Sequence, residues 1–248
     1  MQQLKGFITC LSMNMNLKQR FQNPYLSGSI RTWSNLLYTI WMAFSRGSLH
    51  DILHEQQGIG SSSNPYPALT WSQRIQIALG VAKGLFYIHS NEWAHHNIRS
   101  SNILLCDDET AKIIHPNLWA VCYCTDYFAE DISHPNLRND HKQDDIYNFG
   151  VILLELLTGS KLFDNTRRAR QQHLVSWALP QLDSDKVHKI VDARLKGDYL
   201  RNFTAIRRMA KVAQLCLRDE KYCLPKMLEA MLHLELCFRE TKPQNSRS

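Results

Sequence analysis

The chain has 248 residues, of which 44% are apolar and 21% are charged. A chain of this length forms one or two domains with a core of its own, and this composition excludes an intrinsically disordered protein. The formal net charge is +6, yet residues 1–50 hold five Lys and Arg and no Asp or Glu. The rest of the chain carries 24 basic and 23 acidic residues, which argues against a basic nucleic-acid-binding body.

The cysteine pattern predicts a reduced, cytoplasmic protein, because the seven cysteines are odd in number and none are spaced as C-x-x-C. No apolar run reaches the roughly 18 residues of a transmembrane helix, so none is expected. Residues 1–36 show no clean period and form an atypical basic segment. Their lack of acidic residues leaves organelle targeting by residues 1–36 as a minor alternative, and a wrongly predicted first exon as another.

The first ordered elements are short. Residues 37–44 are apolar and aromatic, which fits a buried strand or a linker, and Arg46-Gly47-Ser48 breaks this run. Leu49, Ile52 and Leu53 then form a short helical face. Residues 56–68 hold two glycines, three serines and two prolines, so a loop is expected there.

A long helix is predicted from Thr70 to Ser90. Thr70 and Gln73 have the spacing of a capping box, and an apolar stripe at helical spacing follows. The members of this stripe are Ile77, Val81, Leu85 and Ile88. Two short strand-like runs come next, 102–105 and 111–114, and the acidic residues between them predict a hairpin.

The second half of the chain reads as helical. Residues 115–142 are polar and are expected to be irregular, whereas Ile146 to Leu157 is apolar on nearly all sides and predicts a deeply buried helix that stops at Gly159. Further helical segments are expected at 174–179, 187–195, 203–217 and 227–238. The sum is a mostly helical body with one small hairpin.

Several motifs in this frame resemble those of protein kinases. His95-His96-Asn97-Ile98-Arg99-Ser100-Ser101-Asn102 resembles the catalytic loop H-R-D-x-K-x-x-N. Asp145-Ile146-Tyr147-Asn148-Phe149-Gly150-Val151 resembles the start of the central buried kinase helix, and residues 153–159 continue it. Residues 46–54, 172–178 and 185–195 are similar to segments of plant receptor-like cytoplasmic kinases, especially the Pto-interactor-like group. The resemblance covers about residues 38–235 in the correct order.

This resemblance implies an α+β protein-kinase-like fold, mainly the helical C-lobe, with the N-lobe largely missing. The expected organisation is an atypical basic segment at 1–36, a hinge and C-lobe at 37–240, and a polar tail at 241–248. The sequence contains no G-x-G-x-x-G and no V-A-I-K-like strand, and residues 1–50 lack the glutamate that would pair with a phosphate-binding lysine.

The family's catalytic positions are altered. Asn97 stands where the resemblance places the catalytic aspartate, and a neutral amide is not a useful base. Arg99 replaces the loop lysine, which keeps the charge but changes its geometry. Asn102 matches the magnesium-binding asparagine, whereas His115 replaces the principal magnesium carboxylate. Magnesium prefers oxygen ligands, so imidazole is a poor substitute.

The resemblance gives His95 and Asp145 structural roles, in which Asp145 anchors the catalytic-loop backbone. Two supporting positions are lost, since A-P-E is at best blurred into Ala129-Glu130 and its arginine partner falls at Leu224. For three other features a structural interpretation is favoured over a functional one. A metal site from His95, His115, Cys122 and Cys124 has the wrong spacing, the basic cluster 167–170 fits a solvated loop, and Thr125 and Tyr127 fit ordinary loop positions.

Three hypotheses follow. The leading one is a catalytically inactive pseudokinase that binds proteins such as a receptor kinase or an active kinase in the cytoplasm, with membrane association only through partners, no nucleic acid and no cofactor. The second is a weak Ser/Thr protein kinase that uses Mg-ATP. The third is a truncated or mispredicted product without stable function.

Overall fold

The computed structural model describes residues 45–54, 68–91, 93–106, 110–114, 135–184, 186–218 and 227–241. The predictions made for residues 1–44, 55–67, 107–109, 115–134, 219–226 and 242–248 lie outside these ranges.

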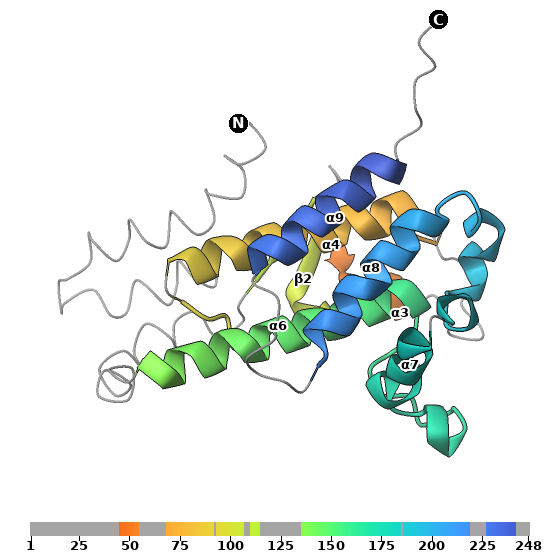
Figure 1. Ribbon diagram of the computed structural model, residues 1–248, viewed down its shortest axis with the longest axis horizontal. Helices are drawn as coiled ribbons and strands as arrows, with labels where there is room; N and C mark the ends of the chain where they lie inside the picture. The colour runs from red at the N-terminus through yellow and green to blue at the C-terminus, as the bar shows by residue number, and fades with distance from the viewer. Residues whose placement is uncertain are drawn as a thin grey trace, which may run out of the picture.

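Within the described residues, four long helices form the body of the molecule: α4 (Trp71–Ser90), α6 (Pro135–Thr158), α8 (Phe203–Cys216) and α9 (Met227–Thr241). They lie side by side, with α4 packed on α9, α9 on α8 and α8 on α6 (Figure 1). Shorter elements complete the description: α3 (Leu49–His54), α7 (Leu174–Asp183) and the 3-10 turns η3 (Ser100–Asn102), η4 (Ala169–Gln171), η5 (Val187–Lys189) and η6 (Ala193–Asp198).

Helix α4 confirms the predicted capping box and apolar stripe. The Gln73 backbone nitrogen donates to Thr70 Oγ1 at 3.3 Å, and the Thr70 nitrogen donates to Gln73 Oε1 at 2.9 Å. These two bonds satisfy donors that the first turn of a helix otherwise leaves unpaired. All four stripe residues are buried, and so are residues beside the stripe, such as Ile75, Ala78 and Ala82. Each fully buried Ile or Leu side chain stabilises the fold by about 1.5–3 kcal/mol.

A three-stranded antiparallel sheet has the order β1-β2-β3, with β1 at Ser45–Ser48, β2 at Ile103–Cys106 and β3 at Ala111–Ile113. The predicted hairpin is confirmed, because β2 pairs with β3. The sequence predicted that residues 46–48 interrupt the strand-like run before them. This prediction is wrong, since these residues form an edge strand against β2. This short polar segment lacks the apolar alternation of a typical strand, and its register shifts between Ser45 and Ser48.

Helix α6 begins at Pro135, so the prediction of an irregular chain over 135–142 is wrong. Proline suits the first helical position, and extending an existing helix costs far less than nucleating one, so polar residues can precede the buried part. The predicted burial of 146–157 is confirmed apart from Tyr147 and Asn148. At Gly150 the helix approaches α8 so closely that a Cβ would collide with the side chains of Cys216 and Leu217.

The later helices are confirmed, with two differences. Helix α7 continues through Pro180 to Asp183, although a proline predicts an end because it cannot donate to the preceding turn. The helix predicted at 187–195 is instead the two 3-10 turns η5 and η6. The chain departs from a regular helix between them, where the Asp192 nitrogen donates to the Leu157 carbonyl at 3.0 Å.

The described cysteines, Cys106, Cys216 and Cys237, are free and buried. Burial raises the pKa of the Cys216 and Cys237 thiols to about 12, so both stay protonated and unreactive at neutral pH. In the part of the chain that the structure describes, no helix combines the length and apolar character needed to cross a bilayer.

Candidate functional site

The centre of the candidate site is the carboxylate of Asp145, which α6 places in a fully buried position. Its Oδ2 accepts hydrogen bonds from the His95 backbone nitrogen at 2.6 Å and from His89 Nε2 at 3.0 Å. Its Oδ1 accepts from the His96 nitrogen at 2.8 Å. Since a carboxylate only accepts, the His89 ring carries its proton on Nε2. Three donors thus hold loop 95–102 and the end of α4 onto α6.

His96 has a left-handed backbone with φ of 63°, which is uncommon for a residue with a side chain. Such a conformation costs on the order of 1–3 kcal/mol and persists only where its surroundings enforce it. Here Asp145 holds the amides of His95 and His96 together. The His96 ring lies edge-on to His141, with 4.6 Å between ring centroids. Burial lowers the pKa of His96, and repulsion from His141 lowers it further, against the opposing attraction of Asp144 and Asp145.

Asn97 and Asn102 face each other across the loop. Asn102 Nδ2 donates to the Asn97 carbonyl at 2.8 Å, and the Asn102 carbonyl accepts from the Ile114 nitrogen at 2.9 Å, which links the loop to the end of β3. The Asn97 nitrogen makes a longer contact of 3.4 Å with His95 Nδ1. Asn97 Oδ1 is buried, and none of the described residues donates to it. The loop is therefore rigid around a neutral amide.

Arg99 lies on the same loop but is exposed, with an extended backbone before η3. Among the described residues it has no ion-pair partner. The structure therefore brings together four of the six residues singled out from the sequence, namely His95, Asn97, Asn102 and Asp145, and leaves Arg99 at the rim. The sixth, His115, lies outside the described residues, as do 129–130, Leu224, Thr125 and Tyr127. No group of three His, Cys, Asp or Glu suited to a metal occurs in the described ranges.

A buried glutamate on α6 also holds this loop in place. Glu155 Oε1 on α6 accepts from Ser100 Oγ at 3.2 Å and lies 3.3 Å from Nε2 of His54 on α3. It therefore joins α3, α6 and η3 at one point. We did not identify this residue from the sequence, although an acidic side chain within the apolar run 151–157 was a usable signal.

A second buried cluster fixes the far end of α6. Arg74 is completely buried and donates to the Leu156 carbonyl at 2.7 Å and to Asp192 Oδ2 at 2.6 Å. Arg194 Nη2 also donates to Asp192 Oδ2, at 2.7 Å. Burial alone would raise the pKa of Asp192, but the hydrogen bonds from Arg194 and the charge of Arg74 outweigh it and leave that pKa lowered. Burial lowers the pKa of Arg74 against the attraction of Asp192.

A helical body in which a buried helix carboxylate clamps a loop of the H-x-N-x-R-x-x-N type defines the larger, helical lobe of a protein kinase. The chain belongs to the protein kinase family, since the family model for protein tyrosine and serine/threonine kinases matches residues 13–221.

Plant kinases are among the proteins to which the chain is similar. A probable receptor-like protein kinase of Arabidopsis thaliana is 41% identical over 199 residues, which cover 74% of this chain and 53% of the relative. The PTI1-like tyrosine-protein kinase 3 of Arabidopsis thaliana is 41% identical over 211 residues, covering 79% and 50%. The EPD1-interacting receptor-like cytoplasmic serine/threonine-protein kinase 5A of Gossypium barbadense is 36% identical over 217 residues, covering 79% and 44%. The chain spans about half the length of these relatives.

Proposed function

We propose that this chain is a catalytically inactive protein-kinase-like domain that serves as a binding or scaffold module in intracellular signalling. The observation that carries the proposal is Asn97, which stands at the position of the catalytic base in a loop whose anchor to Asp145 is intact. A general base must accept a proton at neutral pH, and an amide oxygen does not. In this proposal the loop keeps its backbone anchor and carries an amide in place of the base.

The surroundings of Asn97 support this reading. Its Oδ1 is buried, and no donor reaches it from the described residues. A carboxylate oxygen in the same place would be a buried charge without a donor among the described residues, which costs more than a buried neutral amide. The site suits an amide better than an aspartate, so the substitution agrees with its environment.

The oxygen atoms that this loop could offer as magnesium ligands do not fit Mg-ATP. Magnesium needs carboxylate or phosphate oxygens in octahedral geometry. The loop offers the neutral amide oxygens of Asn97 and Asn102, and Asn102 holds the Asn97 carbonyl through its Nδ2, which leaves the Asn102 oxygen as a single neutral ligand. The sequence places His115 where the family has its principal magnesium carboxylate.

A binding role is the function that such a domain retains. One of the relatives is named for its interaction with another protein, EPD1, which favours protein partners here. We propose a receptor kinase or an active kinase as the partner class.

A radiolabelled phosphotransfer assay on the purified chain with a general protein substrate tests the inactive state. The expected result is no transfer above background, because removal of the base and the magnesium ligand each costs orders of magnitude in rate. Robust transfer that Arg99→Ala abolishes would overturn the proposal.

A weak Ser/Thr kinase is the second candidate, and the retained Asn102 amide and the cationic Arg99 favour it. Thermal unfolding with Mg-ATP separates the two candidates. A nucleotide present at about 100 times its dissociation constant stabilises the fold by about 2.7 kcal/mol. The inactive domain shows no such shift at millimolar Mg-ATP, whereas the weak kinase does. A cooperative unfolding transition in the same experiment would also argue against the third hypothesis, a truncated or mispredicted product without stable function.

A further inference from the structure

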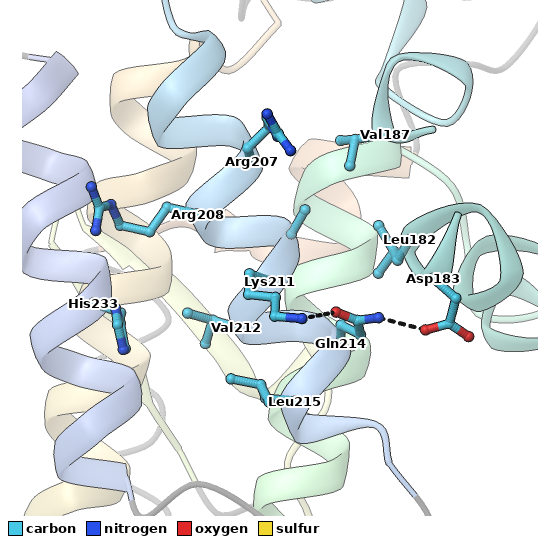
Figure 2. Close-up of a pocket in the computed structure, with 11 residues that line it drawn as sticks. Leu182, Asp183, Val187, Arg207, Arg208, Lys211, Val212, Gln214, Leu215 and His233 are labelled. Carbon is cyan, nitrogen blue, oxygen red and sulfur yellow. Dashed lines mark hydrogen bonds between the residues drawn. The ribbon is translucent and has the colours of Figure 1, made fainter. Parts of the chain in front are cut away.

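A groove of about 530 Å³ is lined mainly by residues of α8. It is bounded by the end of α7 and η5 on one side and by α9 on the other (Figure 2). None of the residues of the candidate site lines it.

The cations of the groove come mostly from α8, which carries Arg207, Arg208 and Lys211 and no acidic residue. His233 of α9 lies at the opposite border (Figure 2). Two carboxylates among the described residues, Glu240 and Asp183, bond to residues that line the groove. Arg208 Nη2 donates to Glu240 Oε1 at 2.8 Å, and Gln214 Nε2 donates to Asp183 Oδ1.

A chain of hydrogen bonds positions Lys211. The Asp183 carboxylate accepts from the Gln214 amide, whose Oε1 in turn accepts from Lys211 Nζ at 2.8 Å (Figure 2). Gln214 therefore fixes the ammonium group through a neutral oxygen while it uses one oxygen of the nearby aspartate. The amide oxygen of Gln214 is neutral, so this hydrogen bond does not offset the positive charge that Lys211 brings to the groove.

The charge around the groove is part of a larger asymmetry. Residues 186–218, which supply η5, η6 and α8, contain nine Lys and Arg and two Asp, and one of these, Asp192, is buried between two arginines. The net charge of this stretch alone is therefore larger than the formal net charge of +6 of the whole chain. A concentrated positive field of this kind raises the local concentration and the association rate of acidic partners.

Apolar side chains accompany these cations. Leu182, Val187 and Leu215 line the groove. Leu200, before α8, and Phe203, the first residue of α8, are exposed, with exposed fractions of 85% and 39%. Arg207 lies over the Phe203 ring at 5.3 Å, so cationic and apolar surface meet at this end. A continuous phosphate backbone would leave this apolar surface uncovered, whereas a protein segment with apolar side chains would cover it.

We propose that this groove binds an acidic segment of a protein partner in which glutamates or aspartates are interspersed with leucines. The acidic side chains pair with Arg207 and Lys211, and the leucines cover Leu215 and the Phe203 end of the groove. The inference rests on the proposed binding role and names the surface and the partner chemistry for it.

Fluorescence anisotropy with the full chain tests the groove. The probe is a short labelled peptide in which glutamates alternate with leucines, and the comparison peptide has lysines in place of the glutamates. The wild-type chain is expected to bind the acidic peptide only, and binding is expected to weaken as ionic strength rises to about 1 M, where the Debye length is about 3 Å. Lys211→Glu is expected to weaken binding about tenfold or more.

The matched control is Arg170→Glu, which reverses the charge of an exposed arginine in the basic cluster 167–170, outside the groove. It is expected to leave affinity within about twofold. Arg207→Glu serves as a second groove variant if Lys211→Glu fails to unfold cooperatively. An equal loss from Arg170→Glu, binding of the lysine peptide, or tighter binding of an RNA oligonucleotide of equal charge would each overturn the proposal.

Failure of the groove and failure of the proposed function give different results. If the acidic peptide does not bind, the groove proposal falls while the phosphotransfer result stands. If the chain transfers phosphate and still binds the peptide at Lys211, the inactive state is wrong and the groove stands.

Discussion

The carboxylate of Asp145 lies 2.6 Å from the backbone nitrogen of His95, a residue 50 positions earlier in the chain. This bond joins the buried helix α6 to the loop that would carry out phosphotransfer in an active kinase. It keeps the loop in shape whether or not the loop is catalytic, because it acts on the backbone alone.

Removal of this acceptor is expected to destabilise the whole domain. Asp145→Ala leaves His95 N, His96 N and His89 Nε2 without their acceptor, and we expect the free energy of unfolding to fall by about 3 kcal/mol. Asp144→Ala is the matched control, because Asp144 is exposed, and its cost should stay within about 0.5 kcal/mol. Urea denaturation measures both variants, and equal losses would contradict the anchoring role of Asp145.

The buried cluster at Asp192 should be sensitive to substitution and to acid. Asp192→Asn leaves the charge of Arg74 buried without its counter-ion, which should cost about 3 kcal/mol or more. The pKa of Asp192 is lowered in the fold, so its contribution is present above its usual pKa of about 3.9 and is lost as pH falls through the folded value. The stability gap between wild type and Asp192→Asn should therefore shrink in acid.

Asp164, which is only partly buried, provides the control for this experiment. Its partners Thr166 and Arg167 are close in sequence, and Asp164→Asn should have a much smaller effect on unfolding. A gap between wild type and Asp192→Asn that does not change with pH would show that the Asp192 charge is not what stabilises the cluster.

Gly159 is expected to resist substitution for a backbone reason. Its φ is 64°, and a Cβ there would collide with the Asp192 carboxylate and the Arg194 guanidinium. Gly159→Ala should cost on the order of 1–3 kcal/mol through backbone strain, plus the displacement of Asp192. Gly197→Ala is the control, because a Cβ at Gly197 meets nothing within 4 Å and the change should be nearly neutral. Similar melting temperatures for the two variants would refute this account of Gly159.

The ring pair of His96 and His141 predicts a titration effect. Burial and His141 together lower the pKa of His96, so His141→Gln should move that pKa back toward about 6.5. Below about pH 6.5 the unfolded chain takes up a proton at His96 before the folded chain does. The free energy of unfolding should therefore decrease as pH falls from the unfolded pKa of His96 to its folded pKa. NMR titration of the ring protons measures the shift, and exposed His188→Gln serves as the control that should leave His96 unchanged.

The sequence was sufficient to predict elements whose signal is local. The capping box at Thr70, the apolar stripe of α4 and the run at 149–157 each depend on residues a few positions apart, and the structure confirms them. The edge strand at Ser45–Ser48 was missed because its pairing with β2 depends on residues far along the chain.

The buried charges could not be predicted for the same reason. Arg74 meets Asp192 across 118 positions, and His54 meets Glu155 across 101. A charged residue in an apolar pattern signals a buried partner but does not identify it. The basic stretch at 186–218 was missed for a different reason. The net charge was summed over all residues after 50, and in that sum the acidic residues of other segments cancel the basic residues of this stretch.

The most direct test of the central claim is phosphotransfer by the purified full chain, with Asn97→Asp and Arg99→Ala assayed in parallel. We predict that the wild-type chain transfers no label above the background of a heat-denatured sample. We also predict that Asn97→Asp alone does not restore transfer, because the sequence still has His115 at the position of the magnesium carboxylate. Robust transfer by the wild-type chain that Arg99→Ala abolishes would contradict the account.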